Sequence, residues 1–396
     1  MAVVSERVVS AQPTYLPQLD GLRAVLASYV VLHHAFSQAW PPGYQVTPPL
    51  VVRQTLSWLY YGHYAVNVFI VLSGFVLTMP VVRHGGLRGG TRRFLVGRFW
   101  RIVPAYYAAI GLSVVLLGTL IGAKTGTHWD YATNLTWTTF LASVFFLHDW
   151  FGHGGVNYVF WSVAVEAKIY LLFPGIVAAW SRIGLPAVVA IVSVVALSIA
   201  RLVRAWYGVA IASWETIVPW YLCLFLLGVL AGVVATSTDE RWSRWRRIPW
   251  GWVCVVGSLG LIGLGYWKGT VGVFHNMDLA DLVVGVVAGC GLISIVSQPG
   301  WVARILATRP LVFVGTFAYS MYLIHAAGLQ LVHQYLIFPW KLTREVQFAA
   351  LVGVGYPLIV LASYGFFKLF EQPFLPRRRV EAEAIAIGAR SPSNAV

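Results

Sequence analysis

Two polar residues stand in the first apolar stretch at a spacing that brings them onto one face of a helix. Arg23 and His34 are eleven residues apart. At about 100° per residue, their side chains point within about 20° of one another and lie about 16 Å apart along the axis. His33 points about 80° away. A cation near one membrane surface, with a titratable nitrogen aligned beneath it, suits a site that binds the anionic end of a ligand and does chemistry at the other end.

Each of these residues also has a purely structural interpretation. A lone arginine near the end of a membrane span can snorkel to the interface, and a histidine inside a span often only hydrogen-bonds a neighbouring helix. The alignment of Arg23 with His34 favours the functional interpretation. His325 fits the structural one better, because no charged residue lies at helical spacing from it.

Glu166 is a second ionisable residue expected at membrane depth. It lies in the apolar run 160–180, about one turn after an expected outer loop. Ser162, four residues earlier, shares its helix face and could hydrogen-bond it. An ion pair with Lys168 is the alternative, but residues two apart do not share a helix face. A carboxylate at this depth suits proton exchange with a neighbouring imidazole.

A pair of arginines gives the third signal. Arg98 and Arg101 are three residues apart at the start of another apolar run. Both guanidinium groups therefore lie on one helix face, near the predicted cytoplasmic end, where they suit phosphate groups. The alternative is a basic cluster that only sets membrane topology.

Composition places the chain among polytopic membrane proteins. Of its 396 residues 58% are hydrophobic and only 11% are charged, which leaves no room for a separate soluble domain. Cys223, Cys254 and Cys290 lie apart in apolar runs without metal-ligand spacing, so we predict no metal site. The net charge of +14 does not indicate a nucleic-acid partner, because the basic residues are spread over loops between apolar runs.

Eleven apolar runs are candidate membrane segments. They are 20–39, 63–82, 101–123, 136–148, 160–180, 185–207, 215–236, 250–268, 277–297, 309–335 and 346–370. The run 136–148 is only about 20 Å long as a helix, too short for a hydrocarbon core of about 30 Å. Only if it does not span do the basic loops 83–101 and 241–247 fall on the same side. The sequence therefore predicts an all-α membrane protein with about ten transmembrane helices plus one short re-entrant or interfacial helix.

The same distribution of charge predicts the domain order and the location. We expect a cytoplasmic N-terminal segment over residues 1–18, a membrane domain over 19–374 and a disordered cytoplasmic tail over 375–396. Most of the 28 Lys and Arg residues then lie inside, as the positive-inside rule requires. No apolar signal-peptide core precedes the first run, so that run is expected to be an uncleaved span. The predicted location is the plasma membrane of the cell, with both termini in the cytoplasm.

Together these residues resemble the acyltransferase-3 family of multi-pass membrane O-acyltransferases. The resemblance covers about residues 15–374 and rests on six motifs in order, of which each alone is weak. They are the run 19–24 with Arg23-x10-His34; the run 69–75; Arg98-x2-Arg101 leading to Pro104 and Tyr106; Trp161-Ser162-x3-Glu166-x3-Tyr170 ending at Pro174; Tyr319-Ser320-x-Tyr322-Leu323-x-His325; and Glu371-Gln372-Pro373-Phe374.

The resemblance implies an enzyme that moves an acyl group, usually acetyl, from cytoplasmic acyl-CoA to a hydroxyl of a glycan, glycolipid, cell-envelope polymer or secondary metabolite. By position it implies a catalytic set of His34, Glu166 and Ser162, and a donor-binding set of Arg23, Arg98 and Arg101. One departure is Lys168, where the family more often has an uncharged residue such as Gln. The chain also ends soon after the last apolar run, so we expect the membrane core alone to handle the acceptor.

The residues themselves agree with this chemistry. Arginines at the cytoplasmic mouth would hold the nucleotide end of acyl-CoA, and about 16 Å from Arg23 to His34 is comparable to the reach of its neutral arm. We expect His34 to take the proton of the acceptor hydroxyl, with Glu166 orienting it or relaying protons. A covalent acyl-histidine intermediate stays open.

A different class of function also fits the composition. In a proton-coupled transporter or flippase of a glycolipid or amphipathic metabolite, Arg23, His34 and Glu166 would form a proton relay. The sequence shows no repeat at a fixed period and no inverted pair of broken helices, which counts against a transporter. Dependence on acyl-CoA distinguishes the two classes.

Overall fold

The structure is a computed structural model of the chain, and it describes residues 15–41, 47–122, 125–127, 129–132, 135–151, 155–207, 218–275 and 277–375. Within these ranges all regular secondary structure is helical, which confirms the predicted all-α class. Most of the predicted N-terminal segment 1–18 and nearly all of the predicted tail 375–396 lie outside the described residues.

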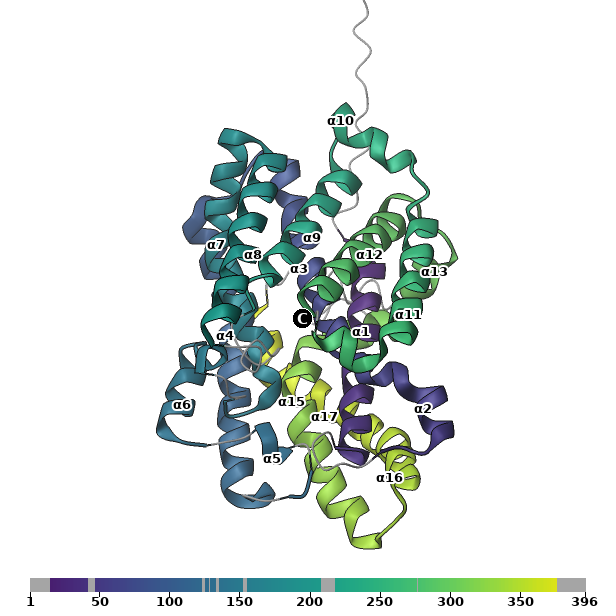
Figure 1. Cartoon of the computed structure of the whole chain (residues 1–396). Helices are drawn as coiled ribbons and strands as arrows, with labels where there is room; N and C mark the ends of the chain where they lie inside the picture. The colour runs from purple at the N-terminus through teal and green to yellow at the C-terminus, as the bar shows by residue number, and fades with distance from the viewer. Residues whose placement is uncertain are drawn as a thin grey trace, which may run out of the picture.

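The long helices form one bundle (Figure 1). They are α1 (Pro17–Ala39), α3 (His63–His84), α4 (Gly90–Leu116), α7 (Trp161–Ile183), α8 (Leu185–Tyr207), α9 (Tyr221–Thr236), α11 (Trp250–His275), α12 (Met277–Ser297), α15 (Ala318–Leu331) and α17 (Tyr356–Phe366). The shorter helices are α2 (Leu50–Leu56), α5 (Trp129–Ala132), α6 (Trp137–Val144), α10 (Glu240–Ser243), α13 (Trp301–Leu306), α14 (Arg309–Thr316) and α16 (Arg344–Ala350).

Seven helical segments of the described chain are long and apolar enough to cross a membrane, or nine if each of two bent helix pairs is one span. The seven are Leu50–His84, Gly90–Ile121, Tyr158–Ile183, Leu185–Val203, Trp250–Trp267, Met277–Ser297 and Arg344–Phe374. The bent pairs are Tyr221–Thr236 with Glu240–Arg247, and Arg309–Thr316 with Ala318–Trp340. Helix α1, the predicted first span, has 23 residues but is not among them, because polar residues such as Arg23 and His34 lower its hydropathy.

The run 136–148, which we predict not to cross the membrane, folds as a short helix and a turn. Helix α6 has eight residues, about 12 Å of helix, and is followed by the helical turn η3 (His148–Phe151). It packs against α4, where the hydroxyl of Tyr106 donates to the carbonyl oxygen of Ser143 at 2.9 Å. The end of α6 is therefore fixed to a long helix.

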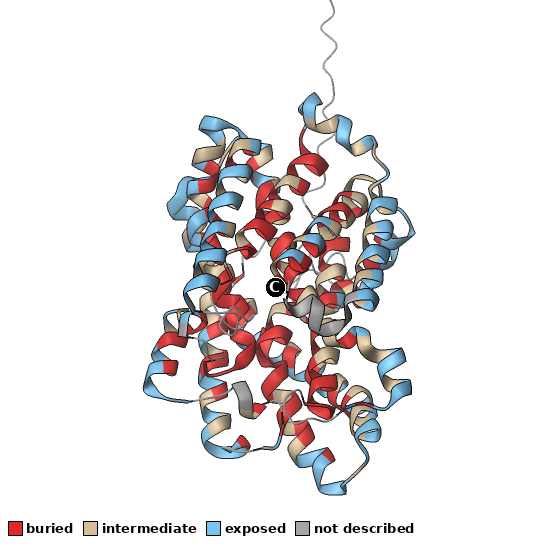
Figure 2. Ribbon diagram, in the orientation of Figure 1, coloured by how far each residue is buried: buried red, intermediate tan, exposed pale blue. Residues whose placement is uncertain are grey.

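Helices α3 and α9 pack at the centre of the bundle through glycine (Figure 1). A Cβ atom added to Gly74 would lie 2.1 Å from the carbonyl oxygen of Phe225, and one added to Gly228 would lie 1.9 Å from that of Val71. Backbones that approach this closely are typical of small-residue packing between membrane helices. Figure 2 shows that buried residues gather on the central helices, whereas the outer helices are largely exposed.

Helix α1 is held by a second pair of glycine contacts. A Cβ atom on Gly21 would lie 1.7 Å from the carbonyl oxygen of Leu306 at the end of α13, and one on Gly315 of α14 would lie 2.0 Å from that of Asp20. Helix α1 then continues along α15. Its first turns therefore lie beside α14, and the turn that carries His34 lies beside α15.

Replacing Gly228 with Ala should destabilise the protein, because the added methyl group would meet the carbonyl oxygen of Val71. Overpacking of this kind costs about 1–3 kcal/mol, which thermal unfolding in detergent can measure. Gly260→Ala is the matched control, because a Cβ atom on Gly260 of α11 would enter open space. Equal unfolding temperatures for the two variants would contradict the close packing of α3 and α9.

Candidate functional site

Helices α1, α3, α4, α7, α14 and α15, with the helical turn Phe367–Glu371, line a cavity of about 420 Å³, which we call the arginine cavity. Its charged and hydroxyl-bearing lining residues are Arg23, Ser73, Arg83, Arg98, Arg101, Ser162, Glu166, Tyr170, Thr316, Tyr319, Tyr322 and Glu371. The cavity thus brings together all three arginines that the sequence analysis singles out. Four guanidinium groups and two carboxylates give it an excess of positive charge, which suits an anionic ligand.

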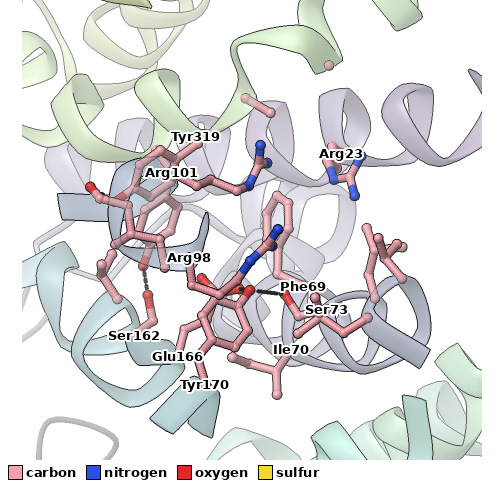
Figure 3. Close-up of a pocket in the computed structure, with 18 of the residues that line it drawn as sticks. Arg23, Phe69, Ile70, Ser73, Arg98, Arg101, Ser162, Glu166, Tyr170 and Tyr319 are labelled. Atoms are coloured by element: carbon pink, nitrogen blue, oxygen red, sulfur yellow. Dashed lines mark hydrogen bonds between the residues drawn. The ribbon is translucent and has the colours of Figure 1, made fainter. Parts of the chain in front are cut away.

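The arginines reach the cavity from three helices. Arg23 comes from α1, where its guanidinium pairs with the buried carboxylate of Asp20, one turn earlier. Arg98 and Arg101 come from α4, and Arg83 comes from the end of α3. In Figure 3 the guanidinium groups of Arg23, Arg98 and Arg101 surround one common space. Their predicted grouping at one end of the site therefore agrees with the structure.

Aromatic rings help to orient Arg98. Its guanidinium carbon lies 5.9 Å from the ring centroid of Phe94 and 5.9 Å from that of Tyr170. Contacts of this length are in the range of cation–π attraction. The guanidinium is thus held at the cavity wall between α4 and α7.

Glu166 is hydrogen-bonded inside the arginine cavity. The hydroxyl of Ser73 donates to its carboxylate at 2.5 Å, and the hydroxyl of Tyr170 also donates to it. Ser162, however, has a different partner from the one expected. Its hydroxyl lies 2.6 Å from that of Tyr322. The expected hydrogen bond from Ser162 to Glu166 is therefore wrong. The reason is that α15 supplies Tyr322 opposite Ser162, whereas α3 supplies Ser73 opposite Glu166.

His34 lies in a second, smaller cavity of about 30 Å³, which we call the histidine cavity. Its lining residues are Val30, His33, His34, Gly62, His63, Val66, Tyr158, Val159, Trp161 and Tyr322. The His34 ring centroid lies 5.1 Å from that of Tyr158 and 5.1 Å from that of His325. Only 9% of His34 is exposed. The predicted catalytic histidine is therefore enclosed, and its neighbours are aromatic and imidazole rings.

Tyr322 and Val66 line both cavities, so they separate the two. The hydroxyl of Tyr322 is fixed by Ser162 and by the carbonyl oxygen of Val159, to which it donates at 2.8 Å. The sequence analysis expects Arg23 and His34 to share one site, but Arg23 lines the arginine cavity and His34 lines the histidine cavity. Glu166 lies in the arginine cavity, so the structure does not place it against His34 as a direct partner.

Sequence reasoning gave no role to several residues that the structure places in the cavities. Ser73 and Glu371 belong to the motifs, and Arg83 to the basic loop 83–101. Glu371 is only 3% exposed and accepts a hydrogen bond of 2.6 Å from Ser320. The sequence signal that could have identified Glu371 is a carboxylate directly after the last apolar run. Among the described residues, no group of three or more His, Cys, Asp or Glu residues could hold a metal ion.

Comparison with known proteins gives a family match over most of the chain. Residues 16–368 match the family described as "Acyltransferase domain". A "Putative O-acetyltransferase" of Staphylococcus aureus (strain COL) is 23% identical over 360 residues, which cover 82% of this chain and 52% of that protein. "Peptidoglycan O-acetyltransferase OatA" of Listeria monocytogenes is 22% identical over 346 residues, which cover 78% and 49%. The chain spans about half the length of these curated relatives. No solved structure matches it at a significant level.

Lys168, at which the sequence departs from the family pattern, does not line the arginine cavity. Its ammonium group donates to the Asp149 carboxylate at 2.6 Å and lies 5.0 Å from the ring centroid of Trp150. Burial raises the pKa of Asp149, and the hydrogen bond from Lys168 opposes this shift. Lys168 therefore ties α7 to the turn η3.

Lys168→Gln should lower the free energy of unfolding by about 1–3 kcal/mol, because it leaves the buried Asp149 carboxylate without its cation. When a carboxyl group has a higher pKa in the folded than in the unfolded protein, the folded protein becomes less stable as pH rises. The loss should therefore be largest at neutral pH and should shrink as Asp149 becomes protonated. Thermal unfolding at several pH values measures both effects.

The double variant Lys168→Gln, Asp149→Asn is the control for this prediction. It replaces the ion pair by two neutral amides, so no charge stays buried alone, and most of the lost stability should return. A double variant as unstable as Lys168→Gln would show that the pair does not act through charge.

Proposed function

Because the chain belongs to the acyltransferase family whose domain covers residues 16–368, we propose that it is a membrane O-acetyltransferase with acetyl-CoA as its donor. The observation that carries the proposal is the gathering of four arginines in one cavity of about 420 Å³. Acyl-CoA has phosphates at one end and a thioester at the end of a long neutral arm. It therefore needs cations that stand well apart from the reacting group.

The order of the two cavities along α1 supports this assignment. Arg98 and Arg101 would bind the phosphates, with Arg23 beside them. The neutral arm would lie along the wall formed by Ser162 and Glu166, and the thioester would pass Tyr322 to reach His34. In this arrangement Ser162 acts through Tyr322, and Glu166 relays protons to His34 through the bound substrate or a water molecule rather than directly.

The proposed reaction needs one base at the thioester. His34 takes the proton of the acceptor hydroxyl as that oxygen attacks the thioester carbonyl carbon. The carbon–sulfur bond then breaks, the thiolate takes the proton back from His34, and free CoA leaves. The acceptor keeps the acetyl group as an ester, so atoms and charge balance without any other reactant.

The named activity of one relative supports an acceptor class. The Listeria protein is named as a peptidoglycan O-acetyltransferase, so we propose a hydroxyl of a cell-envelope glycan as the acceptor. The basic residues Arg88, Arg92 and Arg93 lie on the loop and helix start beside the arginine cavity. The positive-inside rule then supports a cytoplasmic mouth for the donor, with both termini on that side.

Arg98→Ala combined with Arg101→Ala should weaken binding of acetyl-CoA by about 100-fold or more, because two charge-assisted contacts to phosphate are lost. Isothermal titration of detergent-purified protein with acetyl-CoA measures the affinity. Arg241→Ala combined with Arg244→Ala is the matched control, since both residues are exposed in the other basic loop and do not line the cavity. Folded wild type that does not bind acetyl-CoA would favour the transporter or flippase.

His34→Ala should abolish acetyl transfer and leave the affinity for acetyl-CoA unchanged, because His34 lies in the histidine cavity and not with the arginines. Loss of a general base lowers turnover by about 100- to 10,000-fold. Release of free CoA, followed with a thiol reagent, measures turnover. Full turnover in this variant would remove His34 from the mechanism.

A further inference from the structure

Helix α12 carries a carboxylate that is completely buried in the bundle. Asp281 is 0% exposed, although an ionisable side chain at membrane depth is costly and usually has a functional reason. The side-chain amide of Asn67 donates to one carboxylate oxygen at 2.7 Å, and the indole N–H of Trp220 donates to the other at 2.9 Å. Helix α3 and the turn before α9 thus both contact this one carboxylate of α12.

His63 is the basic partner of this carboxylate. Its Nε2 atom lies 3.3 Å from the same Asp281 oxygen that Asn67 contacts. Among the residues that the structure describes, no other basic group is paired with Asp281. The pair therefore has the arrangement in which a carboxylate fixes an imidazole and balances its charge when that imidazole is protonated.

The position of His63 connects this pair to His34, because the two rings line the same histidine cavity. That cavity, of about 30 Å³, has room for a water molecule or a hydroxyl group. His33 fits beside it only because residue 62 is glycine. A Cβ atom there would lie 2.1 Å from the His33 ring. Three imidazole groups, those of His33, His34 and His63, thus line the cavity.

We propose that the reacting hydroxyl meets the thioester at the histidine cavity, and that His63, held by Asp281, donates a hydrogen bond to the thioester oxygen as that oxygen becomes negatively charged. This inference rests on the proposed acetyl transfer. His34 and His63 then have opposite tasks, because the first accepts the proton of the hydroxyl and the second stabilises the oxyanion. His63 is a catalytic residue, and Asp281 is a positioning residue.

The step balances without a further reactant. The acceptor oxygen forms a bond to the carbonyl carbon, and the electrons of the carbonyl double bond move onto its oxygen. His63 donates a hydrogen bond to that oxygen and keeps its proton, while its Nε2 atom stays beside the Asp281 carboxylate. When the carbonyl re-forms, the carbon–sulfur bond breaks and the oxyanion disappears.

The test compares His63→Leu, His63→Gln, Asp281→Asn and Asp281→Glu in purified protein reconstituted into nanodiscs. Release of free CoA from acetyl-CoA with water as the acceptor gives kcat and KM, and titration with acetyl-CoA gives the affinity. Loss of one oxyanion donor should lower kcat of His63→Leu by about 100- to 1,000-fold with KM unchanged. His63→Gln, which keeps an N–H donor, and Asp281→Glu, which keeps the carboxylate, should recover part of this loss relative to His63→Leu and Asp281→Asn.

His333→Leu is the matched control, because His333 is also a buried histidine but lines neither cavity and lies 3.1 Å from the Gln347 side-chain oxygen. Its kcat should stay near that of wild type. Wild-type turnover in His63→Leu would overturn the inference, as would a loss of acetyl-CoA affinity that matches the loss of kcat. Wild type that binds acetyl-CoA without releasing CoA to water would also overturn it. Wild type that does not bind acetyl-CoA would reject the proposed function itself.

Discussion

The burial of ionisable groups inside a bundle surrounded by lipid is the constraint on which this structure depends. Each such group needs a partner, because lipid supplies none. Most of the partners come from another helix, so the polar contacts also fix how the helices are placed. The contacts across elements are Ser73 with Glu166, Asn67 and Trp220 with Asp281, and Ser320 with Glu371. Some of these residues, such as Ser73, Glu166 and Glu371, therefore both line the arginine cavity and hold the bundle together.

Glycine residues allow certain helices of the bundle to approach one another closely. Gly74 and Gly228 let α3 and α9 meet backbone to backbone, and Gly21 and Gly315 do the same for α1 and its neighbours. Helices α1 and α3 also line the arginine cavity, and so does Gly315 itself. The cavity therefore lies within the bundle, directly beside these close contacts.

The sequence predicts those features that one helix contains by itself. The pairing of Arg98 with Arg101 and the shortness of the run 136–148 follow from spacing and length, and the structure agrees with both. The alignment of Arg23 with His34 also follows from spacing, but it does not reveal that the two residues line separate cavities. Contacts between helices do not follow in this way. Spacing on α7 suggests Glu166 as the partner of Ser162, but the choice of Tyr322 depends on how α15 is placed.

Asp281 is a buried residue that sequence reasoning did not single out, for a different reason. It is a carboxylate within an apolar run, so the rule that singles out Glu166 applies to it equally. As the fifth residue of that run, it could lie at the membrane interface, where charged residues are common. Only the packing of α12 against α3 shows that Asp281 is buried beside His63. Uncertainty about where a span begins therefore limits functional prediction more than uncertainty about whether the span exists.

The position of Tyr322 between the two cavities has a consequence for the membrane itself. A continuous wet path from the arginines to the histidines would let protons and small ions leak and dissipate the gradients that the bilayer maintains. Tyr322, fixed by Ser162 and the Val159 carbonyl, stands on that path together with Val66, because both residues line both cavities. In the proposed enzyme the bundle would thus act as an insulator until the thioester arm of the donor passes Tyr322.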